Sequence, residues 1–384
     1  MKIKKMFIFI IMALMFTSCE SGFDDMIQDA GNGRNYKLFA YVANYNAANI
    51  SAYSIDKASG VLTLINNYST GVWPSHIAAD PEGRFLYVVR DENGNYYNFL
   101  SVYKINSDGS LTYINEYTYT QRATDTITVH PNGKFVYVNC MMADGASGNP
   151  GDSYTYIRVY SVDSFGALTF ISEYKTASTG DFTYMKSLAI DPTGKFAYAS
   201  ADWTGKIYAF SINPVTGGLS LITTYTFSGT HSITVDPAGK FAYAKNNGSI
   251  NTYAIDSVSG ELGTPATTAY SGSGSSWGRV GVDSTGSFMY ITDSGLTSQG
   301  YIYAYSVNSS TGALTYVNTV PAGEGAISLS IDPGDKFVYV SNYNDDTVSA
   351  YSINSTTGAL TEIAGSPFAA AGSGNVWSMV TVKK

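Results

Sequence analysis

A small set of ionisable side chains could carry chemistry in this chain. Lys186, His231 and Asp125 are candidates for a nucleophile or a general base, because amine, imidazole and carboxylate groups can attack a carbonyl or take up a proton. Hydrolysis at a carbonyl also needs hydrogen-bond donors for the developing oxyanion. His76 and Arg279 are predicted ligand contacts beside these candidates. A catalytic site would require the fold to bring the five together.

A second set of side chains suits binding without catalysis. We predict ligand contacts at Trp203, Asn247 and Tyr343, because aromatic rings offer flat apolar area while amides can bond sugar or peptide groups. The segments 44–46, 91–97, 202–203 and 342–346 have the same character. The alternative is turn chemistry, since Asn and Asp tolerate left-handed backbone and cap their own turns.

An internal repeat in the sequence predicts the strands and turns that must position these residues. Two turns recur along the chain, and a period of 40 to 50 residues is typical of a β-propeller. The first turn has Asp at position i, Pro at i+1 and Gly at i+3 in its commonest form. It starts at Asp80, His130, Asp191, Asp236, Asp283 and Asp332. The second contains a small residue, Gly, any residue and Leu, with its glycine at Gly60, Gly109, Gly166, Gly217, Gly260, Gly312 and Gly358.

Seven glycine turns predict seven blades. Between the turns lie short segments with alternating apolar and polar residues, such as 337–340, 348–353 and 360–363, and this alternation is typical of strands. The fold class is therefore all-β, a seven-bladed propeller of four-stranded antiparallel blades. The segment 39–46 matches 337–344 but has no inner strand before it. We expect 377–382 to supply that strand and to close the first blade.

The propeller predicts where the candidate residues meet. The inner strands should start on the face that also carries the loops between second and third strands, where ligands are expected. The predicted ring is Ser75, Asp125, Lys186, His231, Gly278, Ile327 and Ser378, with His76 and Arg279 adjacent. The alternative is that these are solvated rim residues without a chemical role. Tyrosines at a fixed strand position (Tyr87, Tyr137, Tyr198, Tyr243, Tyr290 and Tyr339) are interpreted as packing between blades.

One loop is expected to be longer than the others. The spacing between successive Asp-type turns is greatest, 61 residues, from His130 to Asp191. The excess falls between the second and third strands, in Met141–Tyr156, which we expect to overhang the same face. Long loops on a rigid scaffold are either functional or tolerated, and both interpretations remain open.

The N-terminus has the pattern of a targeting segment. Lysines precede an apolar run that is too short to span a bilayer, and Thr17-Ser18-Cys19 follows it. This resembles the lipobox of bacterial lipoproteins, although Phe16 stands where Leu is usual. We therefore expect a signal peptide over 1–18, lipidation at Cys19, a flexible tether over 19–35 and the propeller over 36–384. The alternative is an ordinary secretory peptide with an incidental cysteine.

Composition limits the partners. The net charge of −8 is spread thinly, so nucleic acid is not an expected partner. The spacing of the Asp residues matches no EF-hand, and we expect neither a metal site nor a cofactor. With Cys19 acylated, Cys140 has no cysteine left for an intramolecular disulfide. We expect a monomer that contacts a membrane only through its lipid anchor.

The repeat resembles a known family. The segments 337–342, 347–351 and 357–361 and the Asp-Pro-x-Gly-Lys-Phe segments 191–196 and 236–241 are similar to seven-bladed lactonase-like propellers. That family includes 6-phosphogluconolactonase, fungal muconate cycloisomerase and related YVTN-repeat proteins of bacterial envelopes. The resemblance implies catalytic Arg, Glu and His positions. Here these fall on His231, Asn247 and Lys186, and Ser232 takes the place of a further His.

Two functional hypotheses follow. Because the family's catalytic residue types are absent, the first is a binding propeller at the cell envelope with an envelope or extracellular ligand. On this hypothesis the chain leaves 6-phosphogluconolactone hydrolysis at its spontaneous rate, and alanine at Trp203 or Tyr343 weakens binding. The second hypothesis is a lactonase-like hydrolase with a rearranged site, in which Lys186, His231 and Asp125 serve.

Overall fold

The computed structural model describes most of the chain from residue 36 onward. The described ranges are 36–91, 98–119, 122–143, 153–175, 185–201, 205–227, 229, 231–246, 248–270, 272, 278–293, 299–370 and 374–384. For 122–125, 141–143, 153 and 154 only the backbone is described. These residues contain strands and no helix, and Cys19 and the expected tether lie outside them.

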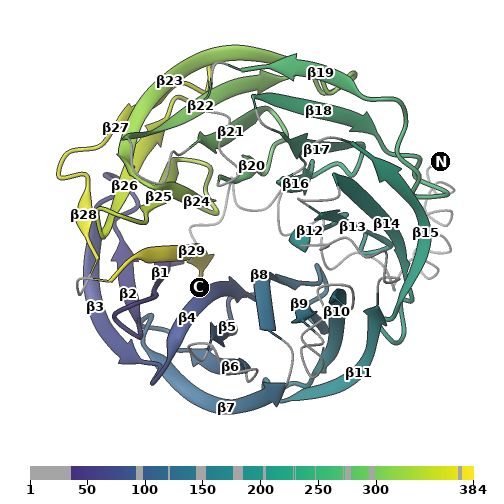
Figure 1. Ribbon diagram of the computed structural model, residues 1–384. Helices are drawn as coiled ribbons and strands as arrows, with labels where there is room; N and C mark the ends of the chain where they lie inside the picture. The colour runs from purple at the N-terminus through teal and green to yellow at the C-terminus, as the bar shows by residue number, and fades with distance from the viewer. Residues whose placement is uncertain are drawn as a thin grey trace, which may run out of the picture. The chain divides into compact units, whose positions relative to one another are not determined.

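Seven antiparallel sheets form a ring, each with one strand near the axis and one at the rim (Figure 1). Blade 1 contains β29 (Val376–Lys383), β1 (Leu38–Asn44), β2 (Asn49–Ile55) and β3 (Leu62–Ser69). Blade 2 contains β4 (Trp73–Ala79), β5 (Phe85–Asp91), β6 (Asn98–Ile105) and β7 (Leu111–Tyr119). Blade 3 contains β8 (Arg122–Val129), β9 (Phe135–Ala143), β10 (Ser153–Val162) and β11 (Leu168–Lys175).

The remaining blades repeat this order from the axis outward. Blade 4 contains β12 (Met185–Ile190), β13 (Phe196–Ala201), β14 (Lys206–Ile212) and β15 (Leu219–Thr226). Blade 5 contains β16 (Ser232–Val235), β17 (Phe241–Lys245), β18 (Ser249–Ala254) and β19 (Ala266–Ala269). Blade 6 contains β20 (Val280–Val282), β21 (Phe288–Asp293), β22 (Gln299–Val307) and β23 (Leu314–Glu324). Blade 7 contains β24 (Ala326–Ile331), β25 (Phe337–Asn342), β26 (Thr347–Ile353), β27 (Leu360–Glu362) and β28 (Phe368–Ala369).

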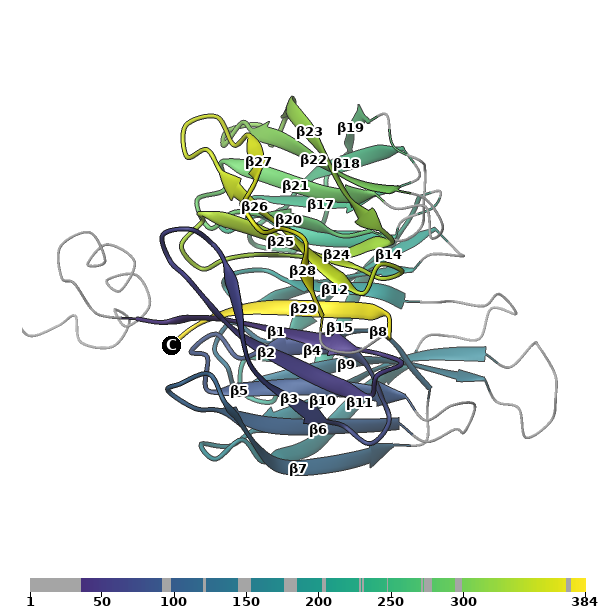
Figure 2. The ribbon, with the colours of Figure 1, turned by 90° about the vertical axis from the view of Figure 1, so that its left-hand side faces the viewer.

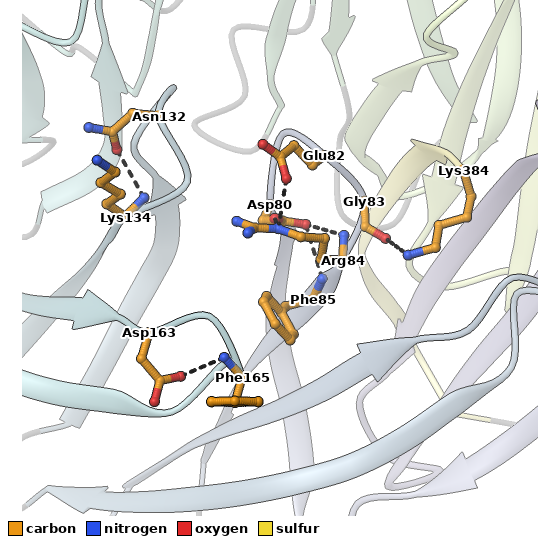
Figure 3. A network of polar contacts seen from close by, with 10 residues as sticks. All are labelled: Asp80, Glu82, Gly83, Arg84, Phe85, Asn132, Lys134, Asp163, Phe165 and Lys384. Atoms are coloured by element: carbon orange, nitrogen blue, oxygen red, sulfur yellow. Dashed lines mark hydrogen bonds and ion pairs between the residues drawn. The ribbon is translucent and has the colours of Figure 1, made fainter.

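The ring closes as the sequence predicts. The last strand, β29, pairs antiparallel with β1 over its whole length, from Leu38↔Lys383 to Asn44↔Val376 (Figure 2). Two backbone hydrogen bonds, of 2.8 and 2.9 Å, join Lys37 and Lys384. The Lys384 ammonium also donates to the Gly83 carbonyl of blade 2, at 3.0 Å (Figure 3). On its other side, the Thr381 hydroxyl donates to the Ile331 carbonyl of blade 7 at 2.7 Å, so the closing strand is tied to both neighbouring blades.

The seams between blades repeat one contact. The glycine of each Gly-x-Leu turn lies on the phenylalanine at the beginning of the second strand of the preceding blade, which is the first residue of that strand except in blade 1, where it is the second. A Cβ atom at Gly60, for example, would lie 2.5 Å from the Phe337 ring. The seven pairs are Gly60 with Phe337, Gly109 with Phe39, Gly166 with Phe85, Gly217 with Phe135, Gly260 with Phe196, Gly312 with Phe241 and Gly358 with Phe288. Blade 7 meets blade 1 through this same contact.

The fixed-position tyrosines lie in these seams, which confirms that they pack between blades. Each is fully buried in the second strand of its blade. Tyr41 holds the same position in blade 1 and is also fully buried. Tyr41 and four of the six donate from their hydroxyl to the carbonyl of the turn glycine: Tyr41 to Gly109, Tyr137 to Gly217, Tyr198 to Gly260, Tyr290 to Gly358 and Tyr339 to Gly60. The Tyr87 and Tyr243 hydroxyls have no such partner among the described residues.

The Asp-type turns form the face opposite to the expected ligand face, and we call it the lower face. Their carboxylates cap the start of the next strand. In blade 7, Asp332 Oδ1 accepts from the backbone N–H groups of Lys336 and Phe337, at 2.7 and 2.6 Å. Burial raises the pKa of Asp332. In the blade 3 turn His130 replaces Asp, and its Nε2 lies 3.0 Å from the Gly194 carbonyl oxygen.

Two details differ from the sequence expectation. The segment Met141–Tyr156 was expected to be a loop, but β9 and β10 continue into it and pair Met141 with Thr155 and Ala143 with Ser153. Only 144–152 remain, and they lie outside the described residues. In blade 7 the outer strand is split, because β27 and β28 both pair with β26.

Candidate binding site on the upper face

The upper face carries the starts of the inner strands and the loops between second and third strands. In blade 2, for instance, the start of β4 pairs with the end of β5, Trp73 opposite Asp91. Several predicted site residues cannot be placed there. Trp203 and Asn247 lie outside the described residues, as does the side chain of Asp125.

Lys186 is the second residue of β12 in blade 4, His231 directly precedes β16 in blade 5, and both are buried. Their exposed fractions are 7% and 3%, so the alternative interpretation as solvated rim residues is wrong for these two. The register of β12 shifts between Met185 and Ser187, and this irregularity leaves Lys186 outside the ladder pairs. The Lys186 carbonyl accepts a hydrogen bond from Thr126 of blade 3, at 2.5 Å.

Arg279 crosses the ring axis and joins three blades. It precedes β20 in blade 6, and its Nη1 donates to the Lys186 carbonyl of blade 4, at 2.9 Å. Its Nη2 lies 3.4 Å from Nε2 of His76 in blade 2. We call Arg279, His76 and Lys186 the axial cluster. The structure therefore brings three of the predicted site residues into contact.

A glycine lets Arg279 reach this position. Gly278 has a φ of +139°, and a Cβ atom there would lie 2.2 Å from the Thr292 carbonyl oxygen. Thr292 also fixes the Arg279 backbone, because its hydroxyl accepts from the Arg279 N–H at 2.9 Å and its own N–H donates to the Arg279 carbonyl at 3.0 Å. The backbone that carries the guanidinium is thus held against β21.

His76 is neutral in this environment. Its exposed fraction is 7%, and burial followed by the charge of Arg279 holds the pKa of His76 well below its usual range. Because a guanidinium can only donate, Nε2 must accept from Arg279, so the ring proton is on Nδ1. Nδ1 has no hydrogen-bond partner among the described residues. The axial cluster thus contains a cation beside a neutral imidazole.

Four half-buried aromatic rings form a row beside the axial cluster. Trp73 lies 5.2 Å from Tyr45, Tyr45 lies 5.1 Å from Trp377, and Trp377 lies 5.1 Å from Tyr343, as distances between ring centres. The edge of the row meets His76, whose ring is 6.3 Å from Trp377. We call these four residues the aromatic row. Burial raises the pKa of Tyr45 to about 12, so its hydroxyl keeps its proton.

Most polar residues of the neighbouring loops are used within the protein. Asn44 donates to Ser51 at 2.7 Å, and Asn342 donates to Ser349 at 2.8 Å, so each closes its own hairpin. Asp345 accepts from the Glu324 N–H at 2.7 Å, and Asp346 accepts from the Asn375 N–H. These residues therefore hold strands and neighbouring loops together, and the expectation that they cap their own turns stays a prediction. The predicted ligand contact Tyr343 differs, since its ring belongs to the aromatic row.

Sequence reasoning missed several contributors. Trp73 was not singled out, Trp377 was assigned only to a strand, and Lys245 was not recognised as part of the site region. Lys245 is fully buried at the end of β17, with its Nζ 5.8 Å from the centre of the Tyr270 ring. Lys245 could have been recognised from the sequence, because it is the one charged residue in an otherwise apolar strand. Burial and then the charge of Asp293 raise the pKa of Tyr270.

Neither a metal site nor a membrane span is found in the part of the chain that the structure describes. No three His, Cys, Asp or Glu side chains there are grouped so that they could hold a metal ion. No helix there is long and apolar enough to cross a membrane. Cys140 is buried as a free thiol, and burial raises its pKa to about 12.

Fold and sequence define one class of protein. The chain matches the family described as "Lactonase, 7-bladed beta-propeller" over residues 34–125, 97–227, 153–277 and 264–376. These ranges cover most of the chain, and the protein belongs to this family. Among curated proteins, none matches it.

Solved structures agree with the fold. A proposed 6-phosphogluconolactonase from Bacteroides uniformis has a TM-score of 0.76 and 17% identity, and the match covers 90% of this chain and 99% of that one. A periplasmic gluconolactonase of Pseudomonas aeruginosa has a TM-score of 0.73, 20% identity and the same coverage. A protein from Lactobacillus plantarum has a TM-score of 0.74 and 16% identity, again over 90% and 99% of the two chains. At these identities the likeness concerns the fold.

Proposed function

We propose that this chain is an envelope-anchored binding propeller that holds a sugar acid, such as an aldonate, on its upper face. The observation that carries the proposal is the position of Arg279, which crosses the axis to His76 and Lys186 beside Trp377. A guanidinium is well suited to a carboxylate, and aromatic faces are suited to the apolar side of a sugar chain or ring. The proposed envelope location rests on the N-terminal pattern and on Cys19.

The charge of the region supports an anionic ligand. Lys186, Lys245 and Arg279 gather near the axis of a protein whose net charge is −8. An acidic group, Asp293, also lies in this region, and its charge acts on Tyr270. Cations gathered at one place in an acidic protein favour binding of an anion there.

A second candidate function is lactone hydrolysis. It is favoured by one observation, the neutral His76 next to a cationic donor, which is a pairing suited to a base and an oxyanion contact. The gluconolactonase of P. aeruginosa with the same fold points in the same direction. However, the Nε2 lone pair of His76 accepts from Arg279, so His76 could act as a base only after Arg279 released it.

One experiment separates the two functions. Calorimetric titration with gluconate and 6-phosphogluconate measures binding, and a pH-stat measures hydrolysis of the corresponding lactones. We expect binding of at least one acid, with both lactones hydrolysed at the rate in buffer alone. Arg279→Gln should weaken binding about tenfold or more, because a hydrogen bond to a charged group contributes about 1.5–3 kcal/mol. Lys336→Gln, at an exposed cation on the lower face, is the matched control and should leave binding unchanged.

The opposite outcomes are equally clear. If neither acid binds, the binding proposal is wrong. If the lactones are hydrolysed faster than in buffer and His76→Gln or Lys186→Ala abolishes the increase, the protein is a hydrolase.

A separate test concerns the lipid anchor. Cys19→Ser should move the protein from the detergent phase to the soluble fraction, and unchanged partitioning would contradict lipidation.

A further inference from the structure

A buried arginine in blade 2 stands where blades 1 and 7 have asparagine. Counted from the seam phenylalanine of the second strand, the sixth residue is Asn44 in blade 1 and Asn342 in blade 7, and both close their own hairpins. The equivalent residue of blade 2 is Arg90, which is 94% buried because its exposed fraction is 6%. Its Nη1 donates to the Thr70 carbonyl of the preceding blade, and its Nη2 forms an ion pair with Glu116 of β7. The guanidinium also lies 5.0 Å from the centre of the Phe99 ring.

A cavity of about 510 Å³ lies at this point, between the outer strands of blades 1 and 2. These strands, β3 and β7, follow one another along the rim (Figure 1). The volume is within the range of about 300–1,000 Å³ that is usual for small-molecule sites. We call it the rim cleft. Its lining is Asn67, Tyr68, Ser69, Thr70, Gly71, Arg90, Tyr103, Tyr113 and Glu116.

The lining combines aromatic faces with fixed polar groups. Tyr113 is 54% exposed and is braced edge-on by the buried Tyr103, with ring centres 5.6 Å apart and planes at 72°. The Asn67 Oδ1 accepts from the Ser51 hydroxyl at 2.8 Å, which orients the amide and leaves its Nδ2 as a donor. The Glu116 side chain is 32% exposed and is held by Arg90 through Oε2, which leaves Oε1 as an acceptor. Groups held in this way lose little conformational entropy when a ligand binds.

We propose that the rim cleft binds a neutral oligosaccharide. One sugar ring would lie on the exposed face of Tyr113, and its hydroxyl groups would bond the Asn67 amide and the Glu116 carboxylate. The charges favour a neutral ligand, because the one cation of the lining, Arg90, is already neutralised by Glu116. The axial cluster has the opposite character, with an excess of cations. This inference does not rest on the proposed function, since the two sites share no residue.

The chain offers a matched control for the test. In blade 6, Tyr316 occupies the position of Tyr113, is 57% exposed, and is braced by Tyr305 with ring centres 5.9 Å apart and planes at 76°. The charged pair is missing there, because Asp293 and Thr319 stand at the positions of Arg90 and Glu116. Tyr316→Ala therefore removes an equally exposed and equally braced ring without touching the rim cleft.

The test is calorimetric titration of the full chain with cellohexaose, maltohexaose, xylohexaose and mannohexaose, and with oligogalacturonate of similar length as the anionic comparison. We expect any binding of oligogalacturonate to be insensitive to Tyr113→Ala, because an acidic sugar can bind the cations of the axial cluster instead. We expect at least one neutral hexasaccharide to bind in the rim cleft. Tyr113→Ala should weaken this binding about two- to tenfold, since an aromatic contact contributes about 0.5–1.5 kcal/mol. Tyr316→Ala should leave it unchanged.

Three results would overturn the proposal. The first is that none of the neutral sugars binds. The second is that Tyr113→Ala and Tyr316→Ala have equal effects, which would place the binding elsewhere. The third is that Tyr113→Ala weakens the binding of oligogalacturonate more than that of the neutral sugars, which would mean that Glu116 does not neutralise the cleft. Because Tyr113 is half exposed, both variants should fold, and their melting temperatures check this.

Discussion

The seams between blades and the starts of the inner strands differ in how they use the repeat. Every seam has the same phenylalanine beneath the same glycine turn, and five of them add the same tyrosine hydrogen bond. Around the axis, in contrast, six residue types occupy the seven equivalent positions, among them Lys186, His231 and Gly278, and only serine occurs twice. The difference indicates that the repeated positions stabilise the ring, while positions free to vary hold the chemistry.

The largest effect that follows from this comparison concerns the closing strand. Deleting 376–384 removes β29, exposes one edge of β1 and takes away the contacts at Gly83. The loss should exceed the 5–15 kcal/mol that is typical of whole-domain stability. We expect the truncated chain, expressed from Tyr36, to aggregate, as judged by its soluble yield and size-exclusion profile. A soluble monomer with the melting temperature of the untruncated chain from Tyr36 would show that the ring does not depend on this strand.

A smaller effect is expected from one methyl group in a seam. Gly260 has a φ of +76°, and a Cβ atom there would lie 2.3 Å from the Phe196 ring. Left-handed backbone costs alanine about 1–2 kcal/mol and overpacking costs about 1–3 kcal/mol, so Gly260→Ala should lower the free energy of unfolding by about 2–5 kcal/mol.

The control for this change is three residues further along. Gly263 has no positive φ, and the nearest atom to its added Cβ is the Ala254 carbonyl oxygen at 3.6 Å. Gly263→Ala should therefore stay within about 1 kcal/mol of the wild type in urea unfolding. If both variants lose equal stability, the seam contact is not the reason for glycine at position 260.

A third effect, smaller again, distinguishes two seam tyrosines. Tyr198 donates to the Gly260 carbonyl at 3.0 Å, whereas the buried Tyr243 hydroxyl has no partner among the described residues. Tyr198→Phe should cost about 1 kcal/mol, because it removes a buried hydrogen bond and leaves the carbonyl without its donor. Tyr243→Phe should be neutral or slightly stabilising. Urea unfolding measures both, and an equal cost for both would contradict the role given to the hydrogen bond.

The smallest effect concerns the axial cluster and depends on pH. The pKa of His76 is lowered in the folded state, so between that value and about 6.5 the unfolded chain binds more protons. The contribution of neutral His76 to the free energy of unfolding is therefore fully present above about pH 7 and is lost as the pH falls. His76→Gln should lose less stability than the wild type between pH 7.5 and pH 5.5. Identical pH dependence in the two proteins would show that His76 is not held neutral.

Much of the fold was predictable because the information is local and repeated. The two turn motifs gave the number of blades, and the missing inner strand before Phe39 located the closure at β29. The site was less predictable, because its contacts join distant residues. Arg279 and His76 are 203 residues apart, and nothing in the repeat indicates that one guanidinium reaches across the axis. Trp377 was recognised as a strand residue, but its contacts with Tyr45 and Tyr343 require the closed ring.

The expectations that were wrong have physical reasons. Lys186 and His231 were weighed as solvated rim residues, but they lie where seven inner strands converge and neighbouring blades cover them. The segment Met141–Tyr156 was expected to be loop, but its two ends can extend an existing ladder, which satisfies their backbone groups. Sequence spacing counts residues between turns and does not show how far a hairpin continues.

The pairing of the two ends of the ring has a mechanical consequence. Lys37 and Lys384 lie at the same end of the β29–β1 ladder and exchange two hydrogen bonds. A force that separates these two residues acts on one pair of backbone hydrogen bonds at a time. The bonds would break one after another, and the ring would open at low force. A force applied between Lys37 and the upper face would instead be shared along whole strands. A propeller tethered at its N-terminal end and pulled through a ligand would therefore resist far more load than one pulled by both ends.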